Sequence, residues 1–228
     1  MNFDNRVRGS FELFGTTVYI TDTIINTWIL MGVLACIAIL VRIALGKFTA
    51  VPTTHRQNLI EAVIQMFDNF VKSTMGEQNR RYGNWFFGVM VFILGSNLMG
   101  LFNLRPPTAD VSTTLALAIT SFLIIQISGI VKQPKAYVSN YFKPFAIFLP
   151  MNLISEIVVP VSLTFRLFSN ILAGMIVVGL IYYLLPIFLT IGIPAFLHIY
   201  FDVFAGAMQA FIFTMLSMTF TKNKVVLD

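Results

Sequence analysis

The chain has 228 residues, of which 57% are hydrophobic and only 11% are charged. Charged residues make up about a quarter of an ordinary soluble domain, so this composition excludes a soluble globular protein and indicates an integral membrane protein. The formal net charge of +5 is spread over connecting segments, which argues against nucleic-acid binding and makes the charges a guide to membrane topology.

The first 131 residues contain three apolar stretches and one amphipathic segment. Residues 1–22 form an N-terminal segment that lacks the features of a signal peptide. Stretches of about 20 apolar residues, the length of a membrane-spanning helix, cover residues 23–45, 84–103 and 111–131. Residues 55–75 carry apolar side chains at helical spacing with charges mostly off that face, which predicts a helix lying on the membrane surface.

The C-terminal part is apolar with almost no loop. After the polar loop KQPKAYVSNYFK, roughly 76 apolar residues follow, interrupted only by Pro160 and by LLPIFLTIGIP. Either three ordinary spans or two long helices, at residues 145–185 and 188–220, would fit this stretch. A helix of about 40 residues rises about 60 Å, twice the roughly 30 Å hydrocarbon core, so two long helices would have to be strongly tilted, as a hairpin.

The distribution of Lys and Arg favours two long helices, and therefore five spans. With five spans and the N-terminus outside, the segments predicted to lie inside contain Arg42, Lys47, Arg56, Lys72, Arg80, Arg81, Lys132, Lys135, Lys143, Lys222 and Lys224. The outside segments contain only Arg6, Arg8 and Arg105. Eleven against three is a clear positive-inside bias. We therefore expect one all-α membrane domain of five transmembrane helices plus the surface helix, with residues 221–228 as a cytoplasmic tail.

Sequence motifs for nucleotide or metal binding are absent. The chain has no phosphate-binding G-x-x-x-x-G-K-[ST], no G-x-G-x-x-G, no H-E-x-x-H and no Cys/His metal spacing. We expect no cofactor, no metal and no bound nucleotide. Function should therefore depend on polar residues inside the membrane.

The last two predicted spans contain an unusual set of polar residues: Asn152, Glu156, Arg166, Asn170, His198, Asp202 and Gln209. An arginine at mid-membrane costs about 2.5–3.5 kcal/mol even on the lenient insertion scale and stays protonated. Arg166 should therefore face protein or water. Intramembrane charges of this kind usually mark an ion path.

Helical spacing groups these residues into two faces. The fourth span carries Ser162, Arg166, Ser169, Asn170, Ala173 and Gly174 at steps of three and four, and the fifth carries His198, Asp202, Gly206 and Gln209. Small residues let a neighbouring helix come close. The topology places Glu156 in the inner half of the membrane, Asp202 and His198 in the outer half, and Arg166 between them, as expected of two offset ion paths separated by a fixed cation.

Simpler interpretations remain open at this point. Arg166 could pair with Asp202 across helices and only fix packing. His198, Asn170 and Gln209 could be interhelical hydrogen-bonding groups. Asn97 and Asn152 are more typical of packing, although Asn152 also falls beside Glu156 on the predicted inner path.

Two motifs, PVSLTFRLFSNILAG and AMQAFIFTMLSMTF, together with NLMGLFNLRPPTADVSTTLALA, resemble subunit a of F-type ATP synthases. The resemblance covers most of the chain. It implies that Arg166 is the essential arginine facing the ring of c subunits, with Asn170 and Gln209 beside it. It implies an outer half-channel at Asp202; Met175 stands where the family often has an acid or histidine, and His198 is our candidate substitute.

The resemblance also implies a function. The chain would be the ion-translocating stator of a rotary H⁺-transporting ATPase, with Glu156 and Asn152 on the inner path, and with Ser162, Ser169, Ala173 and Gly174 giving clearance to the ring. Its partners would be the c ring, the b-subunit peripheral stalk, the rest of the complex and the lipid bilayer. We expect a bacterial plasma membrane location, while the sequence leaves H⁺ or Na⁺ coupling undecided. The alternatives are a stand-alone secondary ion transporter or channel, and a structural scaffold.

Overall fold

The structure, a computed structural model, describes residues 7–13, 16–46, 55–102, 104–142, 145–184 and 192–225. Five of its helical segments are long and apolar enough to cross a membrane: Asp22–Leu45, Glu77–Phe102, Val111–Lys132, Leu149–Leu184 and Gly192–Val225. This confirms the all-α membrane fold class. The predicted connection around residues 185–188, the end of the predicted tail at 226–228, and Arg6, Lys47 and Lys143 lie outside the described residues.

The N-terminal segment forms a β-hairpin that the sequence analysis did not anticipate. Strands β1 (Val7–Leu13) and β2 (Thr16–Thr21) pair in antiparallel register, with Gly9 opposite Ile20. Helix α1 (Asp22–Leu45) follows directly, and the Asp22 carboxylate accepts a hydrogen bond from Arg8 Nε at 2.7 Å. This ion pair joins the start of α1 to the hairpin.

Helix α2 (His55–Met75) occupies the range expected for the surface helix. A glycine at φ 83°, Gly76, ends it, and the 3₁₀ helix η1 (Glu77–Tyr82) turns the chain into α3 (Gly83–Leu98). A positive φ is readily adopted only by glycine. The short 3₁₀ helices η2 (Met99–Phe102) and η3 (Pro107–Ala109) then lead into α4.

Helix α4 (Val111–Lys132) is capped by Asp110, whose carboxylate accepts from the backbone N–H of Ser112 at 3.4 Å. The segment expected as a polar loop instead contains helix α5 (Pro134–Tyr141). Proline at the first helical position suits a helix start, because that residue's missing N–H would have had no partner there. The loop interpretation was therefore wrong over these residues.

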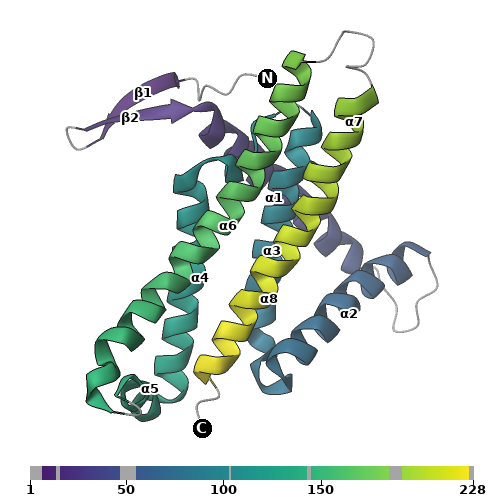
Figure 1. Ribbon diagram of the computed structural model, residues 1–228. Helices are drawn as coiled ribbons and strands as arrows, with labels where there is room; N and C mark the ends of the chain where they lie inside the picture. The colour runs from purple at the N-terminus through teal and green to yellow at the C-terminus, as the bar shows by residue number, and fades with distance from the viewer. Residues whose placement is uncertain are drawn as a thin grey trace.

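The last part of the chain forms two long antiparallel segments that run side by side (Figure 1). After η4 (Ala146–Phe148), helix α6 (Leu149–Leu184) continues through Pro160 without a break. The return segment is α7 (Gly192–His198), then a π-helix, η5 (Ile199–Ala205), then α8 (Gly206–Val225). The helix thus extends beyond the predicted end at residue 220 and includes Lys224.

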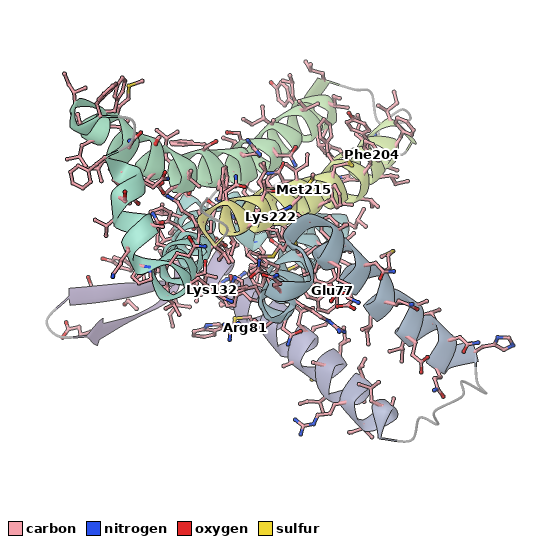
Figure 2. The ribbon with its side chains drawn as sticks, turned by 90° about the horizontal axis from the view of Figure 1, so that it is seen from below. Glu77, Arg81, Lys132, Phe204, Met215 and Lys222 are labelled. Atoms are coloured by element: carbon pink, nitrogen blue, oxygen red, sulfur yellow. The ribbon has the colours of Figure 1, made fainter. Side chains whose placement is uncertain are left out.

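The core forms where α3, α4, α6 and α8 meet. It contains Val89, Ile93, Ala118, Leu163, Leu167, Ala210 and Phe213. Burial of each large apolar side chain contributes about 1.5–3 kcal/mol in water, whereas in lipid such contacts act mainly through close packing. Seen from below, α1 and the His55 end of α2 extend away from the α6–α8 pair (Figure 2), while the other end of α2 packs on α8 through Val71, Met75 and Met218. The core fixes the relative positions of α6 and α8 and leaves one face of that pair exposed.

Candidate functional site

Arg166 lies on the exposed face of α6. Ser162, Ser169 and Ala173, one turn apart along the same face, are exposed as well, and Phe165 beside them is 58% exposed. Within the part of the chain that the structure describes, Arg166 forms no ion pair. The interpretation in which Arg166 pairs with Asp202 to fix packing therefore finds no support in this geometry.

Two members of the predicted α6 face point elsewhere. Asn170 is half-buried and Gly174 is buried. A Cβ atom on Gly174 would lie 3.2 Å from Cβ of Phe201 on η5, which is tighter than normal packing. The small size of Gly174 therefore admits the neighbouring helix of this same chain, and Gly174 does not belong to the exposed face.

Gln209 lies at the same level as Arg166 on the neighbouring helix. Leu163 and Leu167, on either side of Arg166, pack in one cluster with Ala210, the residue after Gln209. The Gln209 side chain is 6% exposed, and its Nε2 has no hydrogen-bond partner among the described residues. A buried amide donor without a partner is costly, so this group lacks a structural explanation among the described contacts.

The first acidic site lies where α7 meets η5. His198 Nδ1 is 2.7 Å from Asp202 Oδ2, and both side chains are largely buried. A Cβ on Gly100 of η2 would lie 2.6 Å from the same carboxylate oxygen. Only glycine at position 100 leaves room for the Asp202 carboxylate where it stands.

A π-helix carries Asp202, and a polar residue of α3 holds its end. Asn97, 1% exposed, donates a hydrogen bond of 3.0 Å from Nδ2 to the carbonyl oxygen of Gly206, the first residue after η5. Its Oδ1 accepts from Thr108 Oγ1 at 3.2 Å. Asn97 thus supports the end of the segment that carries Asp202. π-helical turns of this kind are rare and often occur at functional sites.

A small cavity of about 20 Å³ connects this acidic site with α6. Asn170, Met175, His198 and Asp202 are among the residues that line it. Such a volume holds about one water molecule. The two faces predicted from helical spacing do meet here, through Asn170 on α6 and the His198–Asp202 pair.

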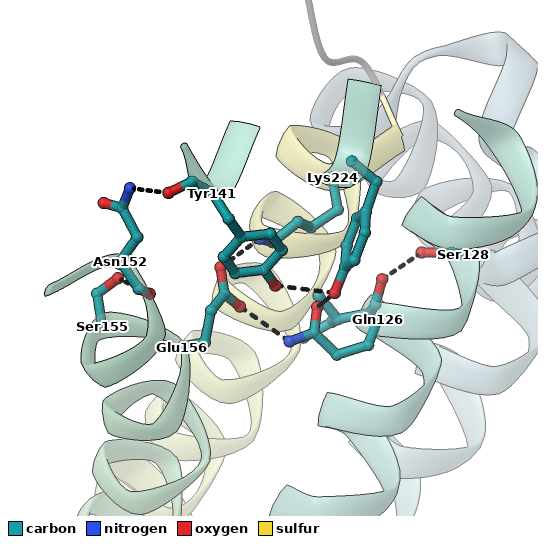
Figure 3. Close-up of polar contacts among 9 residues, drawn as sticks. Gln126, Ser128, Tyr141, Asn152, Ser155, Glu156 and Lys224 are labelled. Carbon is teal, nitrogen blue, oxygen red and sulfur yellow. Dashed lines mark hydrogen bonds and ion pairs between the residues drawn. The ribbon is translucent and has the colours of Figure 1, made fainter. Parts of the chain in front are cut away.

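The second acidic site is centred on Glu156 of α6 (Figure 3). Glu156 Oε2 accepts a hydrogen bond of 2.9 Å from Gln126 Nε2 on α4, and Oε1 pairs with the ammonium of Lys224 on α8. The Lys224 Nζ atom also lies 5.3 Å from the ring centre of Tyr137 and 5.1 Å from that of Tyr141. Three helices and α5 therefore contribute to one polar cluster.

The two tyrosines continue this network. Tyr137 Oη donates to Gln126 Oε1 at 3.0 Å, and the two phenol oxygens are 2.9 Å apart. Burial, and then the hydrogen bond to Tyr137, raise the pKa of Tyr141 above its ordinary value. The hydrogen bond from Tyr137 orients Gln126 toward the Glu156 carboxylate.

A wide cavity of about 420 Å³ adjoins Glu156. Ser155, Asn140, Asn223 and Lys224 are among the other residues that line it. Asn152 is not among the described residues that line this cavity. Its Nδ2 instead donates a hydrogen bond of 2.8 Å to the backbone carbonyl of Tyr141. Asn152 thus ties α5 to α6, which agrees with the packing interpretation of that residue.

The two acidic sites lie on either side of Arg166 along the α6–α8 pair. Glu156 precedes Arg166 by ten residues on one helix, which is a rise of about 15 Å. The cavity at Asp202 begins at Asn170, one turn beyond Arg166. Among the described residues, no group of three or more His, Cys, Asp and Glu side chains could hold a metal ion.

Comparison with known proteins gives the family. The profile of the family described as ATP synthase A chain matches residues 24–222. This chain belongs to that family. An ATP synthase subunit a from Moorella thermoacetica is 34% identical over 217 residues, covering 94% of each chain. A sodium-ion-specific ATP synthase subunit a from Propionigenium modestum is 30% identical over 223 residues, covering 90% of this chain and 74% of the relative.

Membership of the ATP synthase A chain family makes this chain a membrane subunit of the synthase Fo sector that works within a larger complex. The structure adds residues to the site that sequence reasoning missed: Gly100, Gln126, Tyr137, Tyr141 and Lys224. From the sequence, Lys224 was interpreted only as a positive charge of the predicted cytoplasmic tail. Its spacing of three residues from Thr221 and four from Phe220 would have placed it on the helix.

Proposed function

We propose that this member of the family is the ion-translocating stator of a rotary ATP synthase, with two half-channels that open on opposite sides of the membrane. One observation carries the proposal: Arg166 is exposed and without an ion-pair partner in the described chain, with one acidic site on either side of it along the same helix pair. An intramembrane cation exposed in this way needs a partner.

The outer path runs through the His198–Asp202 pair. An ion from outside reaches Asp202 and passes by way of the water-sized cavity toward Asn170. There it neutralises a carboxylate on a c subunit. A neutral carboxylic acid enters lipid far more readily than a charged one, so the neutralised c subunit moves into the bilayer and the ring turns.

The inner path runs through Glu156. After nearly a full turn, the c-subunit carboxylate approaches the other side of Arg166, is drawn into its ionised form by the guanidinium, and loses its ion toward Glu156. The 420 Å³ cavity then gives the ion access to water. Arg166 keeps the two paths apart, because a permanent positive charge repels a proton or sodium ion that would otherwise cross directly.

The exposed face around Arg166 suits a ring of helices. On α6 it presents Ser162, Ser169 and Ala173, and on the neighbouring segment large apolar side chains recur at helical spacing: Tyr200, Phe204, Met208 and Met215. Small residues beside the arginine allow close approach of a partner helix. We assign this face to the c ring, and the peripheral b subunit to contacts elsewhere.

The remaining assignments follow from charge and family. The positive-inside bias supports an N-terminus outside and a C-terminus in the cytoplasm of a bacterial cell. Each elementary charge that crosses gains about 2.3 kcal/mol per 100 mV. We assign ATP synthesis itself to other subunits, since the sequence has no phosphate-binding loop.

The test is Arg166→Ala in the complete ATP synthase, reconstituted in vesicles. We expect ion-driven ATP synthesis to fall to background while the subunits still purify together. Arg42→Ala, at an exposed arginine at the end of α1, should leave synthesis unchanged. Normal coupled synthesis in Arg166→Ala would exclude the stator role, and loss of assembly would favour the scaffold instead.

A further inference from the structure

The Glu156 carboxylate already holds a cation that belongs to the chain. Lys224 pairs with Oε1 of Glu156, and its ammonium faces the rings of Tyr137 and Tyr141. A carboxylate with two aromatic faces is a favourable site for a positive charge. We propose that Lys224 is the gate of the inner ion path: its ammonium occupies the place on Glu156 that the carried ion must take. This inference rests on the function proposed above.

The geometry separates a fixed part of this site from a movable one. Gln126 holds Oε2 of Glu156 at 2.9 Å and is itself held by Tyr137 at 3.0 Å. Glu156 therefore keeps one hydrogen bond and its position when Lys224 leaves. Lysine binds as a compact charge on a flexible four-carbon stem, so it can move without any change in the helices.

The wide cavity gives Lys224 somewhere to go. Lys224 stands in the last turn of α8 and lines the 420 Å³ space beside Glu156, together with the uncharged side chains of Asn140 and Asn223. A rotamer change would move the ammonium from the carboxylate into this cavity, where water can solvate it. Figure 3 shows the Lys224 ammonium, which comes from α8, and the Gln126 amide at the two different oxygens of the Glu156 carboxylate.

The charges around Glu156 make Lys224 the decisive group. The titratable side chains that face the carboxylate in the described structure are Lys224 from α8, and Tyr137 and Tyr141 from α5. Tyr137 and Tyr141 contribute phenol groups, and α4 contributes the uncharged amide of Gln126. Neutralisation of Glu156 by an arriving ion therefore removes the only strong attraction for Lys224 among these groups.

The cycle balances in charge. A proton from the c-subunit carboxylate converts Glu156 from carboxylate to carboxylic acid, and Lys224 is released. Glu156 then gives the proton to water in the cavity, and Lys224 returns to the carboxylate. Because Lys224 and the carried ion compete for one site, Lys224 speeds release toward the inside and opposes rebinding from the inside.

The test is Lys224→Met in Fo reconstituted in liposomes, with passive conduction of H⁺ or Na⁺, whichever the unmodified complex carries, driven outward by a membrane potential. Methionine keeps an apolar stem over the two tyrosines and removes the charge. We expect the inside ion concentration at half-maximal conduction to fall by at least about tenfold, the effect of removing an opposite charge next to a carboxylate. Lys222→Met, at an exposed lysine on the same helix turn, is the matched control and should leave it unchanged.

An unchanged half-saturating concentration in Lys224→Met, with conduction that still depends on Arg166, would overturn the gate and leave the stator function standing. Conduction that does not depend on Arg166 would overturn the proposed function itself. If Lys224 only joined α6 to α8, Lys224→Met would lower the yield of complex without moving the half-saturating concentration.

Lys224→Arg tests the gate even if the methionine variant fails to assemble. Arginine keeps the ion pair and can bind the carboxylate with two hydrogen bonds, so the gate should open less readily. We expect maximal conduction to fall several-fold and the half-saturating inside concentration to rise. Values equal to those of the unmodified complex would overturn the proposal.

Discussion

Each of the two acidic sites pairs a carboxylate with a basic side chain, but the sites differ in where that partner lies in the chain and in the size of the adjoining cavity. Asp202 has its basic partner His198 four residues away on the same helical segment, beside a cavity of about 20 Å³. Glu156 has its partner Lys224 on another helix, 68 residues later in the chain, beside a cavity of about 420 Å³. One site is narrow and locally determined, and the other is wide and depends on tertiary packing.

The basic partners differ in what they can do. A histidine ring can accept a proton on one nitrogen and release one from the other, so under the proposed function the pair at Asp202 passes an ion without a large movement. Lysine keeps its charge near neutral pH, so the pair at Glu156 must separate. Under the proposed function, the outer site would therefore work by exchange in place, whereas the inner site would work by displacement into water.

The largest effect on this comparison is expected from Asp202→Asn. Asparagine keeps the shape and can still bond to His198 but cannot carry an ion, and the adjoining cavity has room for about one water molecule, which leaves no parallel route. Ion conduction should fall on the order of 100-fold or more. Conduction by reconstituted Fo measures this, with assembly checked by purification of the complex. Near-normal conduction would mean that Asp202 is not on the path.

Glu156→Gln is expected to have a smaller effect. The wide cavity supplies water that can accept the ion directly, so conduction should fall only about tenfold rather than stop. The same liposome assay gives both values side by side. A larger loss of conduction in Glu156→Gln than in Asp202→Asn would contradict the prediction that conduction depends more on the narrow site at Asp202 than on the wide site at Glu156.

Gly100→Ala should disturb the narrow site alone. The added Cβ would lie 2.6 Å from Asp202 Oδ2, so the carboxylate must leave its present position beside His198. We expect conduction to fall about three- to tenfold with normal assembly, since a small misplacement of a reacting group lowers rates substantially. Gly88→Ala is the matched control on the neighbouring helix, because a Cβ there meets nothing within 4 Å. Equal effects of the two variants would contradict the close fit at Gly100.

Asn97→Ala should affect stability before conduction. It removes the donor to the Gly206 carbonyl and leaves buried polar groups without partners, at a cost of about 1–3 kcal/mol. Thermal unfolding of the purified complex in detergent should therefore begin at a lower temperature than in the unmodified protein. An unchanged unfolding temperature would show that the π-helical segment does not depend on Asn97.

The smallest predicted effect is the pH dependence of the contribution that Tyr141 makes to stability. Its pKa is raised, first by burial and then by the hydrogen bond to Tyr137, so the folded state binds the phenol proton more tightly than the unfolded state. This contribution to stability is constant below the ordinary value of about 10 and is lost as the pH rises above it. A pH titration of tyrosinate absorbance, compared with Tyr141→Phe, should show Tyr141 ionising later than free tyrosine. Ionisation near the ordinary pH would contradict its burial.

The fold class could be predicted because the length of an apolar stretch and the positions of charged residues follow directly from the order of residues in the sequence. Lengths of apolar stretches and the positions of Lys and Arg indicated five helices, and α2 occupies the predicted residues 55–75. The hairpin Val7–Thr21 and helix α5 were missed because short polar segments carry weak periodicity. Helical spacing placed His198 near Asp202, since that pair is local.

The partner of Glu156 was beyond sequence reasoning for the opposite reason. Lys224 meets Glu156 only after α6 and α8 pack against each other and α5 folds back to add Tyr137 and Tyr141. No spacing along the chain encodes this contact. Similarly, Gly174 shares the helical phase of Arg166's neighbours but is covered by Phe201, which spacing alone does not reveal.

The most direct test of the account asks from which side each site can be reached. In a Cys36→Ser background, Ser155→Cys places a thiol at the wide cavity and Met175→Cys places one at the narrow cavity. Ag⁺, which is small enough for both, is added to one side of the membrane while ion conduction is followed. We expect block from the inside only for Ser155→Cys and from the outside only for Met175→Cys. Block of both from the same side would contradict two half-channels separated by Arg166.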